Sequence, residues 1–261
     1  MKIARRVASG ILMMAVVSVS RAIGGAGTTP LDRVPPTIRE TQMTVRKGRV
    51  VQFQATVIDK RDRTLTLLTA AHCLAPADLG HAIEMVREGE RLVGRIAAVW
   101  QNPSYHPVRS RDHRDPSVRD IVGVDNAIVT VAVEPGSEAQ ERLFRQIKIA
   151  AMAERAAPVG ARQIFLVHVI DQGGQEHVVR AGNHLNAKCL AWGHASYRVK
   201  PGDSGAGVFV LRTTPQGQAL PILIGNVSLT DDRGGIAPLV DRRERWVVEA
   251  FTGQKPREGT P

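Results

Sequence analysis

Hydrophobic residues along this chain gather in short runs separated by turn-forming clusters. Runs rich in Val, Ile, Leu and Thr predict strands over residues 50–58, 65–68, 91–100, 127–133, 163–170, 206–212, 221–227 and 236–240. Strands at this spacing, without long helical patterns between them, favour an all-β sandwich or a pair of barrels over alternating strand and helix units. Only residues 242–252 predict a helix, because Trp246 and Ala250 belong to an apolar set at helical spacing.

The N-terminus has the charged-then-apolar order of a secretory signal peptide. Basic residues open the chain, and the apolar run that follows ends at Ser20, which makes it shorter than the roughly 20 residues that cross a bilayer. We expect residues 1–22 to be a cleaved signal peptide, although small residues also allow cleavage after Ser20. The protein should then be secreted or periplasmic, with no stable membrane insertion after cleavage. Residues 23–44, rich in Gly and Pro, are expected to form a leader.

Charge and cysteine content narrow the possible partners. The net charge of +10 falls to +6 without residues 1–22, which contain four basic residues and no acidic one. The remaining basic residues are spread along the chain, and aromatic residues make up only 4% of it, so we expect no nucleic-acid partner. Cys73 and Cys189 are too few for a disulfide scaffold and lack zinc-site spacing. Their spacing alone does not decide whether the two cysteines form a disulfide with each other.

Three segments carry side chains suited to nucleophilic catalysis. His72 stands where a strand ends, in the string Thr-Ala-Ala-His-Cys, and an ordinary imidazole pKa near 6.5 suits a general base. Asp125 opens an apolar strand, where a carboxylate needs a partner such as a histidine N–H. Asp120 also precedes apolar residues, but the run after Asp125 is longer. Ser204 lies in Gly-Asp-Ser-Gly, whose glycines allow a tight turn with backbone amides facing a ligand.

In this order the three segments resemble the trypsin- and chymotrypsin-like serine peptidases, and further matches extend over residues 45–252. The resemblance implies an all-β fold of two antiparallel six-stranded barrels. They would cover about residues 45–140 and 141–240, before the C-terminal helix, 242–252, and a tail, 253–261.

The resemblance also implies the reaction. Ser204 would attack the scissile carbonyl, His72 would take its proton, and Asp125 would stabilise the imidazolium. The backbone amides of Gly202 and Ser204 would bind the oxyanion. The chain is therefore predicted to be an exported serine endopeptidase that hydrolyses protein or peptide substrates through an acyl-enzyme, with no metal or organic cofactor.

Three residues are implied to bind substrate. Ser228 matches the strand that lines the cleft and is the expected partner of the buried Asp125. Gly235 matches the wall of the specificity pocket. Arg198 falls where the family places the base of that pocket. Its guanidinium would there select acidic substrates, or it points outwards from a reshaped loop.

The chain departs from the family pattern at several positions. Cys73 and Cys189 lack the cysteines that normally pair with them, so both are expected to be unpaired. Cleavage after Ala22 would expose Ile23, a faint match to the family's activating terminus, which pairs with the residue at Asp203. The alternatives to a peptidase are a catalytically silent binding protein on the same scaffold and an esterase or acyltransferase, because fold does not fix function.

Overall fold

The computed structural model describes residues 36–47, 50–106, 124–154, 165–181, 183–186, 189–193, 199–231 and 234–253. The predicted signal peptide, Asp120, Arg198 and most of the predicted tail lie outside these residues.

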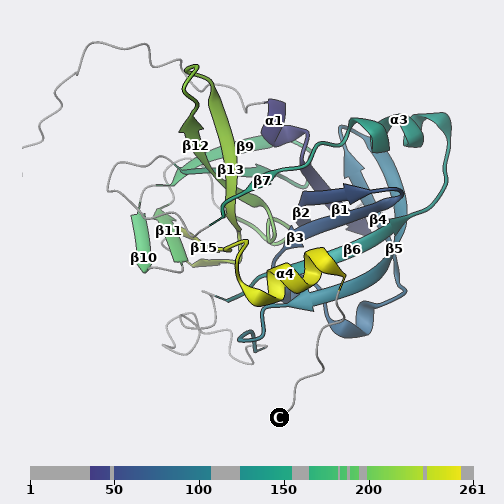
Figure 1. The fold of residues 1–261 in the computed structure, drawn as a ribbon, viewed down its shortest axis with the longest axis horizontal. Coiled ribbons are helices and arrows are strands. Elements are labelled where there is room, and N and C mark those ends of the chain that lie inside the picture. The colour runs from purple at the N-terminus through teal and green to yellow at the C-terminus, as the bar shows by residue number, and fades with distance from the viewer. Residues whose placement is uncertain are drawn as a thin grey trace, which may run out of the picture. The chain divides into compact units, whose positions relative to one another are not determined.

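Six antiparallel strands of the first half close into a barrel (Figure 1). In order around the barrel they are β1 (Gln42–Lys47), β2 (Val50–Arg61), β3 (Thr64–Thr69), β6 (Ala127–Val133), β5 (Glu90–Gln101) and β4 (Ala82–Arg87). The β3–β6 register pairs Leu65 with Val131 and Leu67 with Val129, and all four side chains are fully buried. Alternate residues of each strand therefore fill the barrel, and each such burial contributes about 1.5–3 kcal/mol.

The second half forms two sheets. One has the order β7 (Ala151–Met152), β13 (Ala219–Asn226), β12 (Gly207–Thr213), β8 (Phe165–Ile170) and β9 (Glu176–Ala181). The other has the order β10 (Asn183–Asn186), β11 (Cys189–Gly193), β15 (Gly234–Pro238) and β14 (Leu229–Asp231).

The prediction of two six-stranded barrels is confirmed for the first half only. Among the described residues of the second half, one bridge between Gly225 and Leu239 joins the two sheets. A Cβ at Gly225 would collide with the carbonyl group of Pro238, so only glycine permits this close approach. In the part of the chain that the structure describes, no closed ladder joins the two sheets into a second barrel.

A third core lies between the two halves. It combines Leu68 and Ile128 of the first barrel with Phe209 and Leu223 of the second half, all of them buried. Helix α4 (Arg245–Thr252) adds its apolar face to this core through Trp246, Val247 and Ala250. The predicted C-terminal helix is thus confirmed, although it begins at Arg245 rather than at residue 242.

Among the described residues, α-helices appear at two further places that the sequence did not predict. Helix α1 (Pro36–Arg39) and the start of β1 fall within the predicted leader, 23–44. Proline suits the first position of a helix, and Met43 of β1 is buried inside the barrel. Helix α3 (Glu138–Gln146) begins at a capping box formed by Ser137 and Gln140. Among the described residues, no helix is long and apolar enough to cross a membrane.

Candidate active site

His72 is held in a tight turn at the end of β3. The 3-10 turn η1 (Ala71–Cys73) follows that strand, and the Gln101 side chain donates hydrogen bonds to Ala71 O at 3.0 Å and to Leu74 O at 2.7 Å. These contacts satisfy the carbonyl groups that such a short turn leaves exposed. The His72 side chain is 35% exposed, so one edge of its ring faces solvent.

Asp125 meets His72 at the start of β6. Its Oδ1 accepts from His72 N at 2.9 Å, and its Oδ2 accepts from His72 Nδ1 at 2.7 Å. Ser228 Oγ donates a further, short hydrogen bond to the same Oδ2. The carboxylate is buried and has three donors, which stabilise its charge.

This arrangement sets the proton affinity of the imidazole. Burial by itself would lower the pKa of His72, but the hydrogen bond to Asp125 and the adjacent Cys73 side chain raise it above its ordinary value. With Nδ1–H donating to Asp125, Nε2 is the ring nitrogen left to exchange a proton with a substrate.

Ser204 lies in a loop whose backbone only glycine adopts easily. Gly202 has φ +99° and Gly205 has φ +85°. A Cβ at Gly205 would also collide with Gln54 O and Thr69 Oγ1, so the loop sits directly on the first barrel. Ser204 Oγ donates to Ser228 O at 3.3 Å, rather than to His72. In such sites the contact between serine and base often tightens only when substrate binds.

The amides of Gly202 and Ser204 are available for a ligand. Within the described part of the chain, neither N–H donates a hydrogen bond to another residue. Their carbonyl groups are both occupied, because Gly202 O accepts from Gln54 Nε2 and Ser204 O accepts from Gln54 N. The amides therefore keep the donors that an oxyanion site requires.

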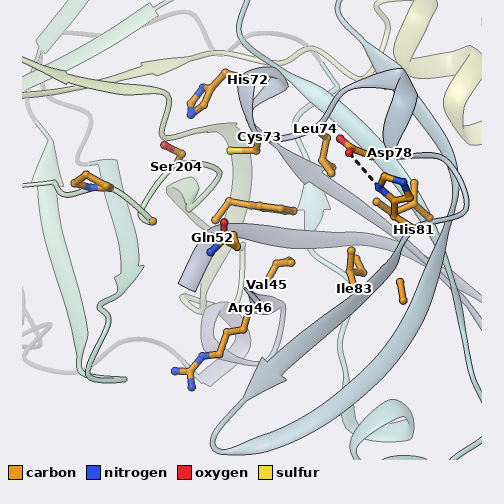
Figure 2. Close-up of a pocket in the computed structure, with 15 residues that line it drawn as sticks. Val45, Arg46, Gln52, His72, Cys73, Leu74, Asp78, His81, Ile83 and Ser204 are labelled. Carbon is orange, nitrogen blue, oxygen red and sulfur yellow. Dashed lines mark ion pairs between the residues drawn. The ribbon is translucent and has the colours of Figure 1, made fainter. Parts of the chain in front are cut away.

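A cavity of about 820 Å³ extends from Ser204 across the mouth of the first barrel (Figure 2). His72, Cys73 and Ser204 lie at one end of it, and Asp78 and His81, which form a 3.4 Å ion pair, lie at the other. The remaining lining combines polar residues, Arg46 and Gln52, with apolar residues that include Val45, Phe53, Leu74, Ala82, Ile83 and Ile96.

The structure brings most of the predicted site residues together. His72, Asp125 and Ser228 are hydrogen-bonded, and Ser204 and Gly202 line the same cavity as His72. The others are not placed there. Gly235 pairs with Trp192 and Thr230 in the second sheet, away from the lining of this cavity, and Arg198 lies outside the described residues.

Two further predictions concern neighbouring residues. Cys73 and Cys189 are both unpaired, as predicted. Asp203 is buried, and its Oδ2 accepts from Lys200 N at 2.6 Å. The predicted partner of Asp203, Ile23, lies outside the described residues.

The sequence did not point to the polar residues beneath the loop. Gln42, Gln54, Thr56 and Thr69 are buried on the first barrel, and each contacts the segment 202–207 or another member of this polar floor. The available signal was the alternation of polar and apolar residues at Gln42–Met43–Thr44 in β1 and Gln54–Ala55–Thr56 in β2, because a strand places alternate residues on one face.

No family model matches the sequence, and a search of curated proteins finds no relative. Solved structures do match. Neuropsin, a serine protease expressed in the limbic system of mouse brain, has a TM-score of 0.55 and 13% sequence identity, covering 84% of this chain and 97% of that one. A mutant of human heparin binding protein (CAP37) has a TM-score of 0.57 and 14% identity, covering 87% of this chain and 97% of that one.

The structural similarity establishes the fold, but at identities this low it does not establish the activity, which depends on the site. One of these proteins is named as a protease and the other for binding heparin, so the fold alone does not decide between catalysis and binding. The chain has the fold of the trypsin-like serine proteases.

Proposed function

We propose that this protein is a serine endopeptidase in which Ser204 is the nucleophile, His72 the general base and Asp125 the group that orients and stabilises His72. The observation that carries the proposal is the hydrogen-bonded series from Ser228 through Asp125 to His72. Beside it, the N–H groups of Gly202 and Ser204 donate to no other group in the part of the chain that the structure describes. A binding role alone would not require this arrangement.

The reaction follows from these positions. Ser204 Oγ attacks the carbonyl carbon of the scissile bond, and its proton passes to His72 Nε2. The amides of Gly202 and Ser204 stabilise the oxyanion that forms, and collapse of the intermediate transfers the proton from Nε2 to the leaving amine. Water then attacks the acyl-enzyme by the same route and regenerates Ser204.

The cavity supports a peptide substrate. The cavity runs on from the catalytic end and offers room for side chains beyond the scissile bond, which a small ester would not use. Export, and protein or peptide partners met outside the cytoplasm, are part of the same proposal. They rest on the signal-like N-terminus.

Labelling of Ser204 tests the proposal. The intact mass of the purified protein is measured before and after reaction with a serine-directed phosphonate, with Ser204→Ala as the matched control. A single adduct on the wild type and none on the variant is the expected result. Folded wild type that takes no adduct and cleaves no member of a peptide library would contradict it, and would favour a silent binding protein.

A further inference from the structure

Gln54 connects three parts of the site. It lies in β2, is fully buried, and forms hydrogen bonds through both its backbone and its side chain. Its N–H donates to Ser204 O at 2.7 Å, and its carbonyl oxygen accepts from Thr69 Oγ1 at 2.7 Å. Its Nε2 donates to Ile170 O at 2.9 Å and to Gly202 O at 3.3 Å, while its Oε1 accepts from Ile170 N at 3.0 Å.

Only a carboxamide can make these side-chain contacts. Two carbonyl oxygens need donors, and the N–H of Ile170 needs an acceptor, at the same position. Glutamine has two N–H donors and one carbonyl acceptor at the end of its side chain, whereas glutamate cannot donate when ionised and methionine provides no donor. The Ile170 N–H also fixes which end of the carboxamide is oxygen, since that group can only donate.

Gln54 holds two carbonyl groups of the nucleophile loop, and they belong to Gly202 and Ser204, the two residues whose amides are proposed to bind the oxyanion. Gly202 O is held by the side chain and Ser204 O by the backbone. Gly202 has no side chain of its own to fix its orientation, and its φ of +99° lies in a region where glycine moves freely. The side chain of Gln54 therefore restrains the peptide group next to the Gly202 N–H.

We propose that Gln54 is a positioning residue for the oxyanion site, and that it acts by orienting Gly202. This inference rests on the proposed peptidase function and names a residue that supports it without touching substrate. Because the same carboxamide binds Ile170 at the end of β8, it also ties the orientation of Gly202 to the docking of the second half against the first barrel.

Gln42 provides a matched control. It is a second fully buried glutamine on the same barrel, and its Oε1 accepts from Gly207 N at 3.5 Å while its Nε2 donates to Thr56 Oγ1 at 2.7 Å. It contacts the segment just after the nucleophile but neither of the oxyanion residues. Loss of its side-chain hydrogen bonds should cost stability without changing the chemical step.

The test compares Gln54→Met with Gln42→Met in the full chain, using a fluorogenic peptide that the wild type cleaves. Removing one oxyanion donor costs about 100- to 1000-fold in kcat, so a donor that is misplaced but present should cost about 10- to 100-fold. We expect that fall in kcat for Gln54→Met, with KM within about threefold of wild type. A peptide trifluoromethyl ketone, whose adduct places an oxyanion in the site, should lose affinity by a similar factor.

The outcomes separate this inference from the proposed function. Wild-type activity with an unchanged kcat in folded Gln54→Met, or an equal loss in Gln42→Met, would overturn the positioning role and leave the peptidase proposal standing. Wild type that neither cleaves peptides nor takes the phosphonate would overturn both. If Gln54→Met does not fold, Gln54→Ala and Gln42→Ala, which leave room for water at the freed backbone groups, provide the same comparison.

Discussion

Replacing Asp125 with asparagine tests the arrangement of the site most directly. The carboxylate accepts from His72 N, from His72 Nδ1 and from Ser228 Oγ, whereas asparagine has one oxygen to accept with. With the amide oxygen at the Oδ1 position, the NH2 group faces Nδ1 and forces the ring proton onto Nε2, where it blocks general-base action. With the oxygen at the Oδ2 position, the NH2 group faces the backbone N–H of His72.

Either orientation therefore damages the site. The first orientation gives the wrong tautomer of His72. In the second, the asparagine NH2 group and the His72 N–H are two donors that face each other across the 2.9 Å that separate Oδ1 from the His72 nitrogen in the wild type. The wrong tautomer in such a triad lowers kcat by roughly 10,000-fold. We expect Asp125→Asn to lower kcat by about 1,000- to 10,000-fold at neutral pH, equivalent to about 4–5.5 kcal/mol of transition-state stabilisation.

The assay is kcat for a cleavable peptide together with the rate of phosphonate labelling at Ser204. Asp171→Asn is the matched control, because Asp171 Oδ2 also pairs with a histidine, His177, at 3.0 Å but does not line the cavity. It should keep activity within about threefold of wild type, as most surface substitutions have small effects. Activity of folded Asp125→Asn within tenfold of wild type would refute the role given to Asp125.

Three further predictions concern pH and stability. Burial lowers the pKa of His168 to about 4 from an ordinary value of 6.5. Unfolding therefore takes up a proton between these two pH values, and the free energy of unfolding should fall by about 3 kcal/mol as the pH drops from 6.5 to 4. His168→Met should flatten this dependence in urea titrations at pH 7 and pH 4.5, and an unchanged slope would contradict the assignment. Cys73→Ala removes one cause of the raised pKa of His72, so the acidic limb of the plot of kcat/KM against pH should move to lower pH. A shift to higher pH would contradict an effect of Cys73 on His72. Gly205→Ala adds a Cβ at φ +85° and a clash with the first barrel. It should therefore lower the free energy of unfolding, measured in urea titrations, by about 2–4 kcal/mol. A loss below about 1 kcal/mol would show that the loop relaxes.

Local pattern was sufficient for β2, β3, β5 and β6 of the first barrel and for the three segments of the proposed triad, but not for β1 and β4. The run 127–133 coincides with β6 because it is almost continuously apolar, with Val129 and Val131 in the barrel core and Ile128 in the core between the halves. Strand β3 is found for the same reason. The histidine and the serine stand beside strand ends and glycines, which are features of local sequence. Such features can be predicted from the sequence because the backbone conformation at each position depends on residues close along the chain.

Other features depend on contacts between distant segments and left a weaker trace. Helix α3 has few apolar residues, since only Leu143 and Phe144 are buried, so its capping box was its main signal. The short strands β7 and β14 form by pairing with β13 and β15 rather than through their own propensity. The role of Gln54 is of the same kind, because its partner Ile170 lies 116 positions along the chain.

The polar floor explains how the nucleophile loop is fixed in a chain whose two cysteines are unpaired. No described disulfide anchors this loop, so its geometry depends on the hydrogen bonds of Gln54 and Thr69 and on glycines that let the backbone approach the barrel. These contacts join the first barrel to the second half, and the proposed triad is divided in the same way, with His72 and Asp125 on one side and Ser204 on the other. Docking of the two halves therefore also places the proposed nucleophile loop on the polar floor, because the groups that hold this loop belong to the first barrel.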